Sequence, residues 1–97
     1  RQLSSNGIVV PVIVVEKETG RISSPPEIVT RGLVEADETS ALISDAGRVL
    51  RETLDARTPE EHQDPGLTRE RVRLELRRFL KRRTQRRPLV VPVVMEV

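Results

Sequence analysis

Two valine-rich runs near the ends of this chain constrain its fold more than any other feature. Residues 8–15 are apolar throughout except for Pro11, and residues 89–97 form a second run that contains Pro92. Both runs are rich in β-branched residues, so each predicts a strand that carries apolar side chains on both faces. A proline cannot donate a hydrogen bond to a neighbouring strand, which favours an edge position for the final run.

Between these runs the pattern predicts another strand and two helices. An extended stretch over residues 21–35 follows a turn that ends at Gly20, and Gly32 within it suggests a bulge or a close backbone approach. Apolar residues at helical spacing predict a helix over residues 37–56 and a second helix that opens at Thr68, its expected N-cap. Residues 57–66 are polar and contain two prolines, so we expect a flexible linker.

The predicted order of elements is ββααβ, which indicates one small α+β domain over residues 1–97. Its expected architecture is a three-stranded sheet with two helices packed on one face. The final strand could lie parallel to the first strand or antiparallel beside the second, and the sequence leaves both arrangements open. Because the chain opens at Arg1 rather than at a methionine, we expect it to be a fragment of a longer protein.

Composition argues against chemistry by this chain alone. It has no cysteine, its one histidine is His62, and its five glycines form no phosphate-binding loop. We therefore expect no catalytic residue, no bound cofactor and no metal site here. No apolar run reaches the roughly 20 residues that a bilayer requires, and the lack of cysteine suits a reducing compartment, so we expect a cytoplasmic location and no membrane partner.

Charge is distributed unevenly along the chain. Residues 1–68 carry seven Lys and Arg against twelve Asp and Glu, whereas residues 69–97 carry ten against three. Such a basic segment suggests a surface for nucleic acid or for an acidic partner. The candidates for binding RNA phosphates are Arg82, Arg83, Arg86 and Arg87. Alternatively, Arg86 and Arg87 hold acidic partners such as Glu27 or Glu35, or dock the module on a larger protein. The only aromatic residue, Phe79, is expected in the core, so base stacking is disfavoured.

Two segments carry a family resemblance. Residues 84–97, Thr-Gln-Arg-Arg-Pro followed by an apolar run ending in Met-Glu-Val, resemble the C-terminal end of bacterial ribonuclease J. Residues 26–34, Pro-Glu-Ile-Val-Thr-Arg-Gly-Leu-Val, resemble a segment upstream in the same domain, and Asn6-Gly7 before a valine-rich strand fits its start. The resemblance covers nearly the whole chain.

The resemblance implies a parent enzyme that joins a metallo-β-lactamase domain and a β-CASP domain to this C-terminal module. Such enzymes degrade RNA as exonucleases and endonucleases, with zinc or another divalent metal held by a histidine-rich motif that this chain lacks. The module itself is then non-catalytic and serves in oligomerisation or in packing onto the catalytic body. The alternative is an auxiliary electrostatic RNA-binding module that guides substrate to the parent's active site.

Strand alternation also predicts an interface. Both faces of the first and last strands are apolar, whereas two helices cover only one face of a sheet. The other face would expose an apolar patch of about 400 Å² or more, which soluble monomers seldom leave in water. We therefore expect a homodimer. The predicted interface residues are Val9, Ile13, Val15, Val90 and Val94.

Overall fold

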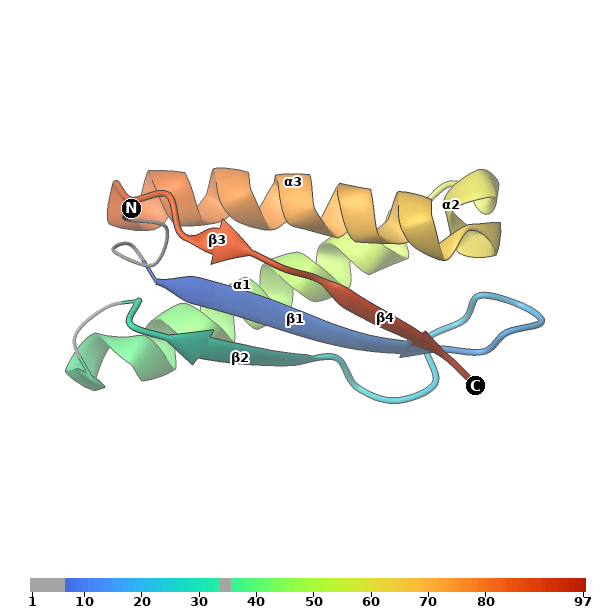
Figure 1. The fold of residues 1–97 in the computed structure, drawn as a ribbon, viewed down its shortest axis with the longest axis horizontal. Helices are drawn as coiled ribbons and strands as arrows, with labels where there is room; N and C mark the ends of the chain where they lie inside the picture. Colours follow the sequence, from blue (N-terminus) through green and yellow to red (C-terminus); the bar gives the residue numbers. More distant parts are fainter. Residues whose placement is uncertain (1–6, 34–35) are drawn as a thin grey trace.

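The first strand lies at the centre of the sheet. In the computed structural model, which describes residues 7–33 and 36–97, β1 (Ile8–Val15) pairs antiparallel with β2 (Glu27–Arg31). On its other side β1 pairs in parallel with β3 (Leu89–Val90) and then with β4 (Val93–Glu96) (Figure 1). The question left open by the sequence is therefore answered: the end of the chain runs parallel to the first strand.

The sheet has four strands rather than the three that were predicted. Val91 donates its backbone N–H to the carbonyl of Val9 at 2.9 Å. In a parallel ladder the return bond would come from the N–H of residue 11, which is a proline and has none. Nearer the C-terminus both bonds form, since Val97 donates to Val15 and accepts from Lys17. The prolines thus divide one predicted strand into β3 and β4.

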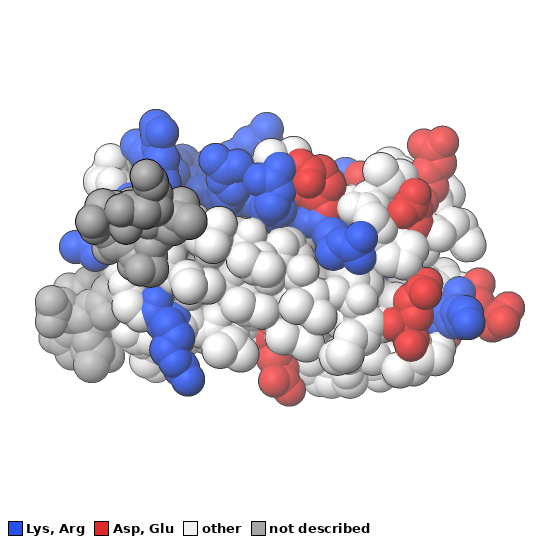
Figure 2. Space-filling model, viewed as in Figure 1, with Lys and Arg blue, Asp and Glu red and all other residues white. Residues whose placement is uncertain are grey.

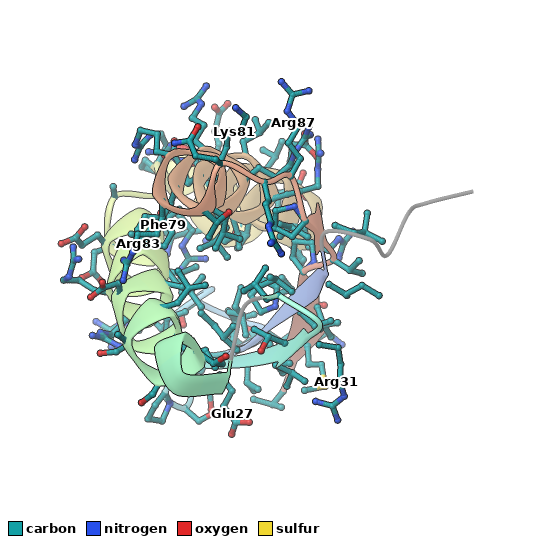
Figure 3. All side chains as sticks on the ribbon, turned by 90° about the vertical axis from the view of Figure 1, so that its left-hand side faces the viewer. Glu27, Arg31, Phe79, Lys81, Arg83 and Arg87 are labelled. Atoms are coloured by element: carbon teal, nitrogen blue, oxygen red, sulfur yellow. The ribbon has the colours of Figure 1, made fainter. Side chains whose placement is uncertain are left out.

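Two long helices cover one face of the sheet. α1 (Ala36–Asp55) and α3 (Pro65–Thr84) pack against each other and against the same side of the strands (Figures 1 and 3). Their buried side chains recur every three or four residues, as a helix with one apolar face requires. The buried residues are Leu42, Ala46, Leu50, Thr53 and Leu54 on α1, and Thr68, Val72, Leu76 and Leu80 on α3. The two stripes meet between the layers and form the core.

The segment predicted as a plain linker contains a short helix, α2 (Pro59–Gln63). Thr58 begins it with a capping box, in which its hydroxyl accepts from the N–H of Glu61 while the Glu61 carboxylate accepts from the N–H of Thr58. Asp64 then caps α3, because its side chain accepts hydrogen bonds from the N–H groups of Gly66 and Leu67 in the first turn of that helix. Proline is well suited to a first helical turn, so the two prolines begin helices here instead of preventing them.

The predicted start of the second long helix was therefore four residues late. Thr68 is not an N-cap. Its side chain is buried within α3, and its hydroxyl donates to the carbonyl of Glu61 at 2.8 Å. This bond and the caps on either side fix α2 against α3.

Glycines permit one close approach of the backbone beside β1. Gly7 and Gly32 both have positive φ, at 94° and 65°. A Cβ atom on Gly7 would lie 2.8 Å from the carbonyl oxygen of Gly32 and from the Cα of Leu33. The close approach suggested by Gly32 in the sequence is confirmed, and it holds the end of β2 against the start of β1.

Candidate functional site

The face of the sheet away from the helices is open and apolar. Register places Val10 beside Val29, Val12 beside Val93, and Val14 beside Met95. The apolar side chains on this face that are more than a third exposed include Val29, Leu89, Val91, Val93 and Met95. The β1 residues between them are half-buried. Figure 2 shows the result as a broad uncharged surface across the middle of the molecule. We call this surface the open face.

The predicted interface residues do not lie on the open face. Val9, Ile13, Val15 and Val90 are at most 4% exposed and belong to the core, and Val94 packs against it. The prediction of two apolar faces is correct, but the helices cover the face that was assigned to a partner. The odd-numbered residues of β1 point toward the helices, and the even-numbered residues form the open face.

Charged side chains border the open face. Glu27 and Arg31, opposite Val12 and Ile8 in the register, bracket Val29 on β2. In Figure 2, Lys and Arg gather above the open face toward the end where α3 finishes, and Asp and Glu gather toward the opposite end. The face seen in Figure 2 therefore has a basic end and an acidic end along the long axis.

The four predicted phosphate-binding arginines separate into different environments. Arg83 donates to Asp45 at 2.5 Å, and its guanidinium lies 5.9 Å from the centre of the Phe79 ring. This hydrogen bond from Arg83 lowers the pKa of the Asp45 carboxyl. Arg86 donates to the carbonyl of Leu33 at 3.3 Å. Arg82 and Arg87 are exposed. Two of the four thus contribute to internal contacts that join parts of the fold.

The alternative pairing with Glu27 is not formed. Figure 3 labels Arg87 and Glu27, and they lie on opposite sides of the molecule. Glu35, the other proposed partner, lies outside the described residues. Phe79 is half-buried between the helices, packs against the core and is covered by Arg83.

A cleft that the sequence did not predict lies between α3 and the chain that follows it. It has a volume of about 280 Å³. Its lining residues are Leu74, Arg77, Arg78, Lys81, Arg87 and Pro88. The spacing of the four α3 residues, with intervals of three and four, was the available signal that they share one helix face. What sequence reasoning missed was that the chain folds back after α3 and adds Arg87 to them. We call this feature the basic cleft.

Arg57 is the one arginine held inside the fold among the described residues. It is 8% exposed and donates to the carbonyls of Leu54 and Gly20 and to the hydroxyl of Thr68. Burial lowers the pKa of Arg57. These bonds connect the end of α1, the loop after β1 and the start of α3. Arg57 therefore stabilises the contact of the helices with the sheet.

His62 is half-buried and lies near Arg57 rather than in a solvated linker. Its carbonyl approaches Gly20 so closely that a Cβ there would lie 1.9 Å from the oxygen. Within residues 7–33 and 36–97, no three His, Cys, Asp or Glu residues are grouped to hold a metal ion. Nor does any helix in the described part of the chain have the length and apolar content to cross a membrane.

Comparison with known proteins identifies the family. A family model for the ribonuclease J C-terminal domain matches residues 1–97. The chain belongs to the ribonuclease J C-terminal domain family. It is 34% identical over 97 residues to ribonuclease J2 of Bacillus subtilis strain 168. This match covers all of this chain and 18% of that protein. It is 30% identical over 95 residues to ribonuclease J 2 of Staphylococcus aureus strain NCTC 8325, covering 98% of this chain and 17% of that protein.

The resemblance found in the sequence is thereby confirmed, and the chain spans less than a fifth of the length of these relatives. The two segments that carried the resemblance lie on the two sides of β1. Residues 26–34 include β2 and the Gly32 turn, whereas residues 84–97 include the end of α3 and the strands β3 and β4. In this chain, the two segments together flank the central strand on both sides.

Proposed function

We propose that this chain is the non-catalytic C-terminal module of a ribonuclease J-type enzyme of the cytoplasm, and that its open face mediates self-association. The relatives that cover the whole chain are named ribonucleases, and they are more than five times its length. RNA hydrolysis, on metallo-β-lactamase and β-CASP domains, would belong to the remainder of such a parent. Any divalent metal would be held there, because the described residues offer no ligand cluster for it.

The observation that carries this proposal is the continuity of the open face. Its exposed apolar residues come from β2, from β3 and β4 and from the residue between these two, with half-buried residues of β1 between them in one sheet, so they form one patch rather than scattered positions. Val93 and Met95, at 37% and 47% exposure, lie beside two half-buried valines of β1. A contiguous apolar patch of this kind marks a protein contact.

A second copy of the chain would match the open face in its distribution of charge as well as in its apolar surface. In such a dimer the two open faces would lie against each other, related by a two-fold axis that runs perpendicular to the strands. This axis would make the long axes of the two copies point in opposite directions. The basic end of each copy would then lie over the acidic end of the other (Figure 2). The interface would be self-complementary, with aliphatic side chains at its centre and charged side chains at its rim.

The test is the solution mass of the chain and of a variant with a charged open face. Light scattering at several concentrations should give twice the chain's mass, and Val12→Lys with Val93→Lys should give a folded monomer. Ser40→Lys with Ser44→Lys adds the same charge at exposed positions on α1, which lies on the other side of the sheet, and should leave the dimer unchanged.

A chain that is monomeric at high micromolar concentration would contradict self-association. The same variants in a full-length parent then test whether the open face packs on the catalytic body instead. An unchanged assembly state and unchanged thermal stability of that parent would reject a contact role for the open face altogether.

A further inference from the structure

We infer that the basic cleft binds the sugar–phosphate backbone of single-stranded RNA. This surface is distinct from the open face, because it is lined by α3 and by the turn that follows it. The choice of RNA as the ligand rests on the proposed ribonuclease parent. The existence of an anion site rests on the geometry and charge of the cleft alone.

The turn after α3 builds the basic cleft. Gln85 ends the helix in the left-handed conformation, with φ of 61°, so the chain reverses instead of continuing along the helix axis. Thr84 fixes this turn, since its hydroxyl accepts from the N–H of Arg86 at 3.1 Å and donates to the carbonyl of Leu80 at 2.7 Å. Arg87 and buried Pro88 are thereby held against the helix face that carries Leu74.

Most of the cations in the basic cleft form no ion pair. Of its four cations, Arg78 alone has an ion pair, with Glu75 at 3.3 Å, and both partners of that pair are largely exposed. Across the described part of the chain, no hydrogen bond or ion pair from a side chain engages Arg77, Lys81 or Arg87. On the rest of α3, Arg71, Arg73 and Arg83 each lie against a carboxylate, whereas Arg69 and Arg82 are exposed and form no ion pair with a described residue.

The gathering of three unpaired cations around one cleft points to an external anion. Arg77 and Lys81 are four residues apart on α3, where like charges repel and destabilise a helix. Figure 3 shows Lys81 and Arg87 on the same side of the molecule, both directed outward. A bound polyanion would relieve this repulsion. Binding would also release the counterions that are otherwise held by the polyanion.

The lining of the basic cleft favours a nucleic-acid backbone in one strand. Guanidinium groups match phosphate oxygens in two-point hydrogen bonds, and Lys81 adds a mobile point charge. Leu74, which is 39% exposed, and Pro88 provide an apolar wall for a sugar ring. No aromatic side chain lines the cleft, so bases are not stacked and their sequence is not read. A volume of about 280 Å³ admits part of one strand.

The experiment compares two variants of equal net charge by titrating the chain into a fluorescent uridine oligonucleotide at several salt concentrations. One variant replaces the cleft residues Arg77, Lys81 and Arg87 with Gln. The control replaces three exposed cations outside the cleft, Lys17, Arg51 and Arg69, with Gln. Circular dichroism establishes that both variants are folded.

We expect the cleft variant to weaken binding roughly tenfold at 100 mM salt, and the control to weaken it much less. The slope of the logarithm of affinity against the logarithm of salt concentration should fall by about 2 in the cleft variant, as three lost phosphate contacts to a single strand require. An adenosine oligonucleotide of the same length should bind equally well.

Three outcomes would overturn the inference. Equal weakening by both variants would mean attraction by overall charge without a site. Tighter binding of polyglutamate than of RNA would assign the cleft to an acidic protein. Binding of neither polymer at low salt would reject an anion site. None of these outcomes bears on the open face, whose test is the solution mass, so failure of one proposal is distinguishable from failure of the other.

Discussion

The covered and open faces of the sheet have similar side chains but different surroundings. On the covered face, Val9 and Ile13 are 1% and 0% exposed beneath two helices. On the open face, Val93 and Met95 are 37% and 47% exposed although they belong to equally apolar strands. Aliphatic content therefore shows that each face should be buried, but it does not show by what.

The charged residues of β2 indicate which face the helices leave open. Exposed Glu27, Val29 and Arg31 alternate with the half-buried Ile28 and Thr30 along this strand. The antiparallel register carries that alternation to β1, because residues opposite each other share a face. A single short strand with two charges thus distinguishes the faces, whereas the two longer valine-rich runs do not.

The largest expected effect comes from placing the same charge on each face in turn. Ile13→Lys would bury an ammonium group in the core, at a cost of several kcal/mol, comparable with the whole stability of a small domain. We expect that variant to be unfolded at 25 °C. Val12→Lys, one residue away on the open face, should keep native far-UV circular dichroism and cooperative unfolding in urea. If Ile13→Lys folded and Val12→Lys did not, the assignment of the two faces would be reversed.

A smaller effect is expected from loosening the helices that cover one face. Arg57→Ala removes the bonds to Gly20, Leu54 and Thr68 and leaves their oxygens with fewer partners, so the free energy of unfolding should fall by about 2–3 kcal/mol. Arg51→Ala, at an exposed position on α1, is the control and should change the free energy of unfolding by less than about 0.5 kcal/mol. Urea unfolding followed by circular dichroism measures both, and equal midpoints for the two variants would contradict the role given to Arg57.

Much of the fold could be predicted because its signals are local. The valine runs gave the strands at both ends, and spacing gave the stripes that include Leu42, Leu50, Val72 and Leu76. The short helix α2 was missed because the two prolines of residues 57–66 were interpreted as helix breakers. Prolines in the first turn of a helix are compatible with it, and the pair Thr58 and Glu61 was the available capping signal.

The two candidate surfaces were harder to predict because they depend on contacts between distant segments. Which face of the sheet the helices cover follows from the register in which β2 pairs with β1. The loop between these strands is long, so the register could not be predicted from the sequence. The basic cleft depends on Gln85 reversing the chain, which a residue other than glycine seldom signals. Among the four arginines predicted from charge density alone, Arg83 and Arg86 form hydrogen bonds within the fold.

The smallest expected effect concerns the ion pair that joins the two covering helices. Asp45 on α1 meets Arg83 on α3, and the pKa of Asp45 is lowered, chiefly by its hydrogen bond from Arg83. A lowered pKa in the folded state means that the pair stabilises the fold above the ordinary aspartate pKa of about 3.9, and that this stabilisation is lost as the pH falls through the lowered value. Both side chains are more than a third exposed, so the contribution should be modest.

Asp45→Asn should therefore lower the urea midpoint at pH 7 by less than Arg57→Ala does. The difference between variant and wild type should disappear once the pH lies below the lowered pKa. Glu18→Gln, which removes an exposed carboxylate from the loop after β1, is the control and should leave the midpoint unchanged at pH 7. A gap between Asp45→Asn and wild type that persisted unchanged into strong acid would show that the side chain acts through packing rather than charge. The covered face would then depend on apolar contacts and Arg57 alone, without help from this surface ion pair.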